Sequence, residues 1–320
     1  MLKSKDEISK YIADGRVLLL AGEEEALSGL PKGNWIGGTI PYFMDETGGL
    51  VSRDRIFATE LPPDVIRTTI KEYDEKSIGS IASDAFENGF TFLVIPSGSK
   101  VHVKYAQDAP NFDGIFLHPV VGWISGIHLS DMGGKTPKVF NGKDLKRSDS
   151  SAIAIHCELT PKKSCRIGMV NLFEQGTGDA LGFDEEGFTV RNCLVNGRKT
   201  SFSAYLREKG IDTKLPLVAD YCGTMVNVSI QEVRADEVAL YAPVFKGVEY
   251  RIAKPVQDYV NQFKAALPKG ISPVFSCNCI LNFLYSNLEG KKTERMYGPV
   301  TFGEIAYQLL NQTLVYLVIE

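Results

Sequence analysis

Two cysteines in the last quarter of the chain have a residue type and spacing that would suit metal binding or nucleophilic catalysis. Cys277 and Cys279 are separated by one residue in the segment 273–280, which is predicted to be a β-strand. Side chains alternate along a strand, so both thiols would lie on the same face. A thiol pair of this kind could bind a soft metal ion, or one thiol could act as a nucleophile.

A metal site at these cysteines would need about two further ligands, because zinc sites in proteins usually have four. No other Cys or His lies nearby at a ligand spacing, and His156 with Cys157 would contribute only if folding brought that segment alongside. Strand cysteines are commonly core residues. We therefore predict no metal and no cofactor.

A nucleophilic cysteine would need a base within hydrogen-bond reach, oriented by a third group. The histidines all lie in the other half of the chain, at His102, His118, His128 and His156. We therefore assign no catalytic residue and favour a binding function over catalysis. A cysteine-dependent hydrolase or transferase that uses Cys277 or Cys279 is the alternative.

Other segments could contribute to a binding site. Backbone N–H groups of Gly37, Gly38 and Thr39 could hold an anion, although the chain has neither a P-loop nor a dinucleotide-binding glycine motif. Trp123 lies in an apolar segment and is either a core residue or a pocket wall. Glu304 follows Gly303 at a turn, and its carboxylate would be either solvated or in contact with a ligand.

Three segments near these residues match one family in type and order. Phe275-Ser276-Cys277, Phe302-Gly303-Glu304-Ile305 and Asn311-Gln312-Thr313-Leu314 resemble the C-terminal half of FIST sensory proteins. Gly37-Gly38-Thr39 is similar to a segment of the family's N-terminal half, and 195–206 is similar to its helix opened by an Asn-Gly turn. The resemblance touches most of the chain and is strongest after about residue 195.

This resemblance implies an α+β fold in two lobes, residues 1–195 and 196–320, with mixed and antiparallel sheets packed face to face and helices outside. It implies a sensory, signal-transduction protein that binds a small molecule such as an amino acid, has no output domain of its own and acts on a signalling partner. The implied ligand site lies between two groups of residues: Gly37, Gly38 and Thr39 on one side, and Cys277, Phe302, Gly303 and Glu304 on the other. Trp123 is a separate candidate for a wall of the site.

Composition limits the other function classes. The 320 residues are 44% hydrophobic, which allows sizeable cores, and a net charge of −4 without a basic stripe argues against nucleic acid. The apolar run 17–21 is too short for a signal core or a membrane span, so we expect a cytoplasmic protein without membrane insertion. A homodimer and a purely structural role are compatible with this composition.

Periodicity predicts which segments form helices and which form strands. Helices are expected at 4–13, with a capping box formed by Ser4 and Glu7, and at 63–73, 78–88, 200–209 and 254–267. Strands are expected at 16–21, 34–40, 49–57, 90–95, 114–121, 151–158, 166–173, 188–195, 224–232, 236–243, 273–280 and 311–319. Segments 151–158, 166–173 and 188–195 are predicted to form an antiparallel meander, and 131–149 a surface loop. We expect 273–280 and 311–319 to share a sheet.

Overall fold

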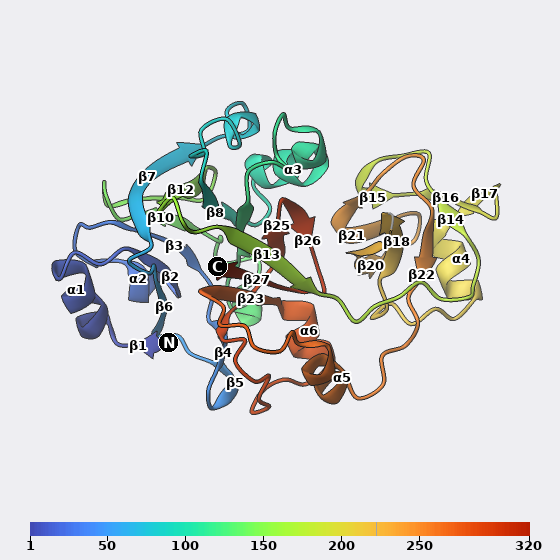
Figure 1. Cartoon of the computed structure of the whole chain (residues 1–320). Helices are drawn as coiled ribbons and strands as arrows, with labels where there is room; N and C mark the ends of the chain where they lie inside the picture. Colours follow the sequence, from blue (N-terminus) through green and yellow to red (C-terminus); the bar gives the residue numbers. More distant parts are fainter. Residues whose placement is uncertain (222) are drawn as a thin grey trace.

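The computed structural model describes residues 1–221 and 223–320, and the chain forms a mixed α+β fold. Five β-sheets are divided between two parts, visible in Figure 1. Residues 1–170 and 254–320 form a main body of three six-stranded sheets. Residues 171–253 form an inserted lobe with a six-stranded and a three-stranded sheet. The expected α+β class with sheets packed face to face is therefore confirmed.

The first sheet of the main body carries two helices on its outer face. Its strand order is β1 (Leu2–Lys3), β6 (Ile56–Glu60), β2 (Leu18–Gly22), β3 (Trp35–Thr39), β10 (Val139–Asn141) and β11 (Lys146–Ser148). Helices α1 (Lys5–Ala13) and α2 (Glu24–Leu27) pack on it through Ile8, Ile12 and Leu27. The predicted capping box of Ser4 and Glu7 opens α1.

The second sheet contains the parallel pair that positions the site described below. Its order is β26 (Gln308–Leu310), β25 (Glu304–Ala306), β9 (Val120–Ser125), β8 (Gly89–Pro96), β12 (Ala152–Leu159) and β7 (Val65–Tyr73). β8 and β9 are parallel and are joined through helix α3 (Lys100–Asp108). Short 3-10 turns lie at Ile78–Ser80, Ala109–Asn111 and Leu129–Asp131.

The third sheet places the cysteine strand beside the C-terminal strand. Its order is β13 (Cys165–Val170), β27 (Leu314–Ile319), β23 (Phe275–Cys279), β24 (Gly298–Thr301), β4 (Tyr42–Asp45) and β5 (Gly48–Val51). β23 and β27 are antiparallel, with Cys277 opposite Val315, as expected. Helices α5 (Tyr259–Ala266) and α6 (Ile280–Tyr285) flank β23 in the chain.

One hydrophobic core joins the three sheets of the main body. Phe275 from the third sheet stacks on Trp123 of the second at a centroid distance of 5.6 Å and meets Phe92 edge-on at 5.0 Å. Leu19 and Ile36 of the first sheet belong to the same cluster. The sheets therefore depend on each other for burial.

The inserted lobe packs against α3 and the neighbouring strands of the main body. One sheet has the order β17 (Arg198–Ser201), β16 (Asn192–Val195), β14 (Leu181–Gly182), β22 (Tyr250–Ile252), β18 (Leu217–Tyr221) and β19 (Thr224–Val228); the other has β15 (Gly187–Val190), β21 (Val238–Val244) and β20 (Ile230–Val233). The remaining helix is α4 (Phe202–Glu208). A single apolar cluster contains Tyr105 of α3 together with Leu240 and Phe183 of the lobe.

Two predicted helices are wrong. Residues 65–73 form strand β7, because successive residues of this segment, which is rich in β-branched side chains, pair with β12, for example Thr69 with His156. Residues 78–88 contain only the 3-10 turn at Ile78–Ser80, followed by turns. Both segments have apolar spacings that fit a helix, and the distant strand β12 decides the first case.

The predicted division near residue 195 does not match the sheets. β27 pairs with β13, β24 with β4, and β25 with β9, so strands from both sides of residue 195 share two sheets. The separate part of the chain is instead the inserted lobe. The predicted meander is also wrong, because β12 pairs with β7 and β8, whereas β13 pairs with β27.

Several element boundaries differ from the predictions. The strand expected at 49–57 is divided into β5 and β6, and the strand expected at 114–121 is found at Val120–Ser125 as β9. The helix expected at 254–267 covers only Tyr259–Ala266, as α5. The expected loop 131–149 contains β10 and β11, which extend the first sheet. Among the described residues, no helix has the length and apolar composition to cross a membrane.

Candidate functional site

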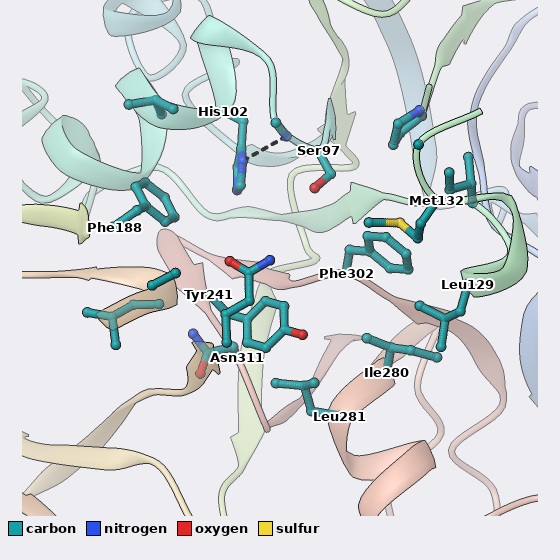
Figure 2. A pocket seen from close by; sticks show the side chains of 18 of the residues that line it. Ser97, His102, Leu129, Met132, Phe188, Tyr241, Ile280, Leu281, Phe302 and Asn311 are labelled. Carbon is teal, nitrogen blue, oxygen red and sulfur yellow. Dashed lines mark hydrogen bonds between the residues drawn. The ribbon is translucent and has the colours of Figure 1, made fainter. Parts of the chain in front are cut away.

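A pocket of about 480 Å³ lies between the main body and the inserted lobe. Its main-body wall includes Ser97 and Gly98, directly after β8, and Ile127, shortly after β9. These are the carboxyl ends of a parallel strand pair, where open α/β sheets usually bind their ligands. In Figure 2 the wall on the α3 side carries His102, and Tyr241 and Asn311 lie across the pocket from it.

The lining of the pocket is mainly apolar. Its apolar side chains come from both parts of the chain: Ile127, Leu129, Met132, Phe188, Leu240, Ile280, Leu281, Leu284 and Phe302. Four large apolar residues that line the pocket are also exposed to solvent, with exposed fractions of 58% for Met132, 39% for Val103, 38% for Leu284 and 37% for Leu129. An apolar molecule seated there would cover these side chains.

His102 contributes a buried polar group to the α3 wall. The residue is only 8% exposed, and its Nδ1 accepts a hydrogen bond from the Gly98 N–H at 3.2 Å. Nδ1 therefore carries no hydrogen, which places the ring hydrogen on Nε2. Burial lowers the pKa of His102 to about 4, so the ring is neutral at physiological pH. Its Nε2 has no hydrogen-bond partner among the described residues.

Asn311 contributes a second buried polar group from the opposite wall. It precedes β27 and is 2% exposed. Its Oδ1 accepts hydrogen bonds from the backbone N–H and the hydroxyl of Ser229, at 3.2 and 2.7 Å. The N–H donor of Ser229 fixes the orientation of the amide, so Nδ2 faces away from these bonds. No described residue accepts a hydrogen bond from Nδ2.

The charged residues at the pocket are cations. Lys135 and Arg234 line it, whereas none of the described lining residues is Asp or Glu. Both cations also pair outside the lining: Lys135 lies 3.0 Å from Glu25, and Arg234 lies 2.7 Å from Glu237. Further carboxylates offset these charges, because Lys135 also lies 3.7 Å from Asp131 and Arg234 also lies 2.8 Å from Glu232. The pocket therefore combines apolar walls with two buried N–H donors.

Of the residues predicted for the ligand site, Phe302 lines this pocket. Its ring packs on Gly126, where a Cβ would lie 2.4 Å from Phe302 Cδ1. Its backbone N–H donates to the Ile124 carbonyl at 3.1 Å, and the Ile124 N–H donates to the Gly303 carbonyl at 2.8 Å. Gly303 therefore supports the wall from behind, in contact with Ile124 and Leu309.

Glu304 faces the protein interior and is fully buried. Its carboxyl group accepts hydrogen bonds from the Thr313 N–H at 3.3 Å and the Thr313 hydroxyl at 2.8 Å, and Thr301 Oγ1 lies 3.4 Å away. Burial raises the pKa of this carboxyl to about 8. Glu304 is therefore not solvated at a turn, and it does not line the pocket.

The other predicted site residues lie together in the packed core. Gly37, Gly38 and Thr39 belong to β3, and the Thr39 carbonyl accepts a hydrogen bond from the Gly126 N–H at 2.7 Å. Trp123 is 1% exposed and pairs across strands with Glu304. The structure thus brings the two predicted groups of residues close to each other, but side chains fill the space between them.

The surroundings of Gly38 show how tightly this region is packed. A Cβ at Gly38 would lie 2.6 Å from Val94 Cγ1 and 3.0 Å from Trp123 Nε1. We therefore expect Gly38→Ala to lower the free energy of unfolding by about 1–3 kcal/mol through overpacking. Gly178→Ala is the matched control, because no atom lies within 4 Å of its Cβ position. Equal stability of the two variants in urea unfolding would contradict this packing.

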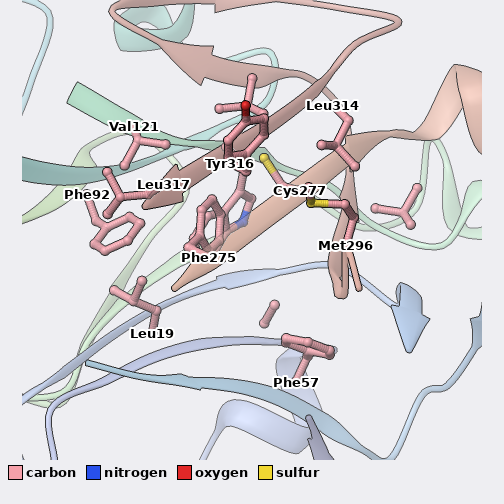
Figure 3. Packing of buried hydrophobic residues seen from close by; sticks show 14 of the residues in the cluster. Leu19, Phe57, Phe92, Val121, Phe275, Cys277, Met296, Leu314, Tyr316 and Leu317 are labelled. Carbon is pink, nitrogen blue, oxygen red and sulfur yellow. The ribbon is translucent and has the colours of Figure 1, made fainter. Parts of the chain in front are cut away.

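The cysteine pair is embedded in the same core. Figure 3 shows Cys277 beside Leu314 and Tyr316, and its Sγ lies 3.4 Å from the Gly122 carbonyl. Burial and the nearby Glu304 raise the pKa of Cys277 and Cys279 well above the usual range of a thiol. A nucleophilic cysteine needs a lowered pKa and access to solvent, so this environment favours a core role. Among the described residues, no three His, Cys, Asp or Glu side chains are grouped to hold a metal ion.

Sequence reasoning missed the two buried donors of the pocket. From the sequence, His102 is a candidate only as a base for a cysteine, and Asn311 only as part of a family motif. The signal available for His102 was its place in the first turn of a helix that follows a buried strand. Nothing local indicates that residues 102 and 311 line one pocket, because they come together only through the fold.

The structure thus defines an α+β protein with a pocket of a size suited to small molecules. The chain matches DUF6976, a family of unknown function, over residues 3–320, and it belongs to this family. No curated protein matches the chain in sequence.

Proposed function

We propose that the protein binds a small molecule in the pocket between the main body and the inserted lobe, and acts as a sensor. The carrying observation is the group of exposed apolar residues, Val103, Leu129, Met132 and Leu284, gathered around a pocket with buried polar atoms. Ligand sites combine apolar walls with a few polar groups in this way. The sensory role rests on the resemblance to FIST proteins.

A ligand in this pocket would contact both parts of the chain. Its walls come from α3, α6 and the segment 127–137 of the main body, and from β15, β20 and β21 of the lobe. A bound molecule would therefore favour the arrangement of the main body and the lobe in which both walls contact the molecule. A partner protein that binds the same arrangement would sense the occupied state.

A pocket-blocking variant tests this function. Val103→Trp places a large ring at the rim of the pocket, at a residue that is 39% exposed and therefore tolerant of change. A ligand at about one hundred times its dissociation constant should stabilise the wild type by roughly 2.7 kcal/mol. We expect a thermal-shift screen of small apolar acids, alcohols and amino acids to give hits that Val103→Trp weakens.

The control for this screen is Lys104→Trp, the next residue of α3, whose side chain is 47% exposed and which does not line the pocket. It should leave the shifts unchanged. Hits that respond equally to both substitutions, or to neither, would place the ligand elsewhere and contradict the proposal.

A further inference from the structure

Two buried side-chain atoms of the pocket lining are donors that lack a hydrogen-bond partner. Among the described lining residues, the buried side-chain atoms without a hydrogen-bond partner are His102 Nε2 and Asn311 Nδ2. Both carry hydrogen and can only donate, given the orientations that Gly98 and Ser229 impose. A buried donor without a partner is costly, so a bound molecule that brings acceptor oxygens would gain from both.

The surroundings of His102 favour an acceptor with negative charge. His102 lies in the first turn of α3, whose N-cap is Ser99. The Ser99 hydroxyl already accepts a hydrogen bond from the His102 amide at 3.1 Å, and the helix dipole is positive at this end. Lys135 and Arg234 are the charged residues of the described lining; each is paired with carboxylates outside it, and no described lining residue is acidic.

We infer that the ligand is an apolar monocarboxylic acid whose carboxylate lies at the start of α3 against His102, while Asn311 donates to a ligand oxygen from the facing wall. This inference rests on the proposed function and names its ligand class. The apolar body of the acid would lie along Met132, Leu129 and Leu284. The described lining offers no carboxylate for an ammonium group, so an α-amino group would be buried without an ion-pair partner.

Matched compounds separate the possible ligand classes. Three compounds share one branched body: 4-methylpentanoate, 4-methylpentan-1-ol and L-leucine. A second set shares an aromatic body: 3-phenylpropanoate, 3-phenylpropan-1-ol and L-phenylalanine. In isothermal titration at pH 7, each acid should bind about tenfold tighter than its alcohol, because hydrogen bonds to a charged group are the stronger ones. Each acid should also bind about tenfold tighter than its amino acid.

Two substitutions test the assigned donors. His102→Phe keeps a planar ring and removes the Nε2 donor, so it should weaken the acids about tenfold and the alcohols much less, whereas His102→Gln retains a side-chain donor and should recover part of the loss. Asn311→Asp is nearly isosteric, can keep the hydrogen bonds from Ser229, and puts an oxygen in place of Nδ2. It should selectively weaken the acids through charge repulsion.

The outcomes distinguish this inference from the proposed function. The inference would be overturned if the alcohols or the amino acids bind as tightly as the acids. It would also be overturned if neither His102→Phe nor Asn311→Asp changes the affinity for the acids. If Val103→Trp still weakens the bound compounds in that case, the pocket remains the binding site. If no compound in either set responds to Val103→Trp, the proposed function fails together with the ligand class.

Discussion

Replacement of Phe275 by Ala is expected to lower the free energy of unfolding by about 3–5 kcal/mol. Phe275 is 2% exposed and contacts Trp123 and Phe92 of the second sheet from its position in the third. Its removal would leave a cavity where the sheets of the main body meet. Urea unfolding, followed by circular dichroism, measures the change.

Phe116→Ala is the matched control for this substitution. Phe116 is 58% exposed and has an aromatic neighbour, Tyr307, at a centroid distance of 5.9 Å. The same change of residue type there should cost less than about 1 kcal/mol. Similar losses for Phe275→Ala and Phe116→Ala would show that the three sheets do not share the core described above.

Glu304 should make the stability of the protein fall as the pH rises from about 4.5 to 8. The pKa of its carboxyl is raised from an ordinary value of 4.5 to about 8, mainly by burial. Within this window the folded protein keeps a proton that the unfolded chain has released, so higher pH favours unfolding. The loss across the window is on the order of 4 kcal/mol, because one pKa unit corresponds to about 1.4 kcal/mol.

Glu304→Gln isolates this contribution, because the amide does not titrate. The free energy of unfolding, measured in urea at pH 5, 6, 7 and 8, should fall more steeply for the wild type than for Glu304→Gln. His102 and His156 act in the opposite direction, since burial lowers the pKa of each to about 4, and they are present in both proteins. Glu87→Gln, at an exposed residue, should follow the wild type. Parallel curves for the wild type and Glu304→Gln would refute a buried, protonated Glu304.

Local patterns in the sequence were sufficient to predict those helices and strands whose formation depends on residues nearby in the chain. The capping box of Ser4 and Glu7 predicted the start of α1, and the apolar run 314–319 predicted a buried strand. Segment 65–73 could not be predicted in this way, because its partner β12 begins at Ala152. Helix and strand patterns overlap in such a segment, and only the distant pairing decides between them.

The candidate site could be predicted only in part, because its residues also come together through contacts between distant parts of the chain. Phe302 lines the pocket, whereas Glu304 is buried in the core and does not line it. Predicting the two donors would have required the contact between α3 and the inserted lobe. That contact joins residues far apart in the chain, such as Tyr105 and Leu240 in one apolar cluster.

The strand order of the third sheet also affects how the protein can fold during its synthesis. β4 and β13 are made early, but their neighbours β24 and β27 begin only at Gly298 and Leu314. Until those residues have left the ribosome, the nascent chain exposes unpaired strand edges and apolar faces, which are prone to aggregation. Production of this protein in cells should therefore depend on chaperones that hold the chain until the third sheet can close.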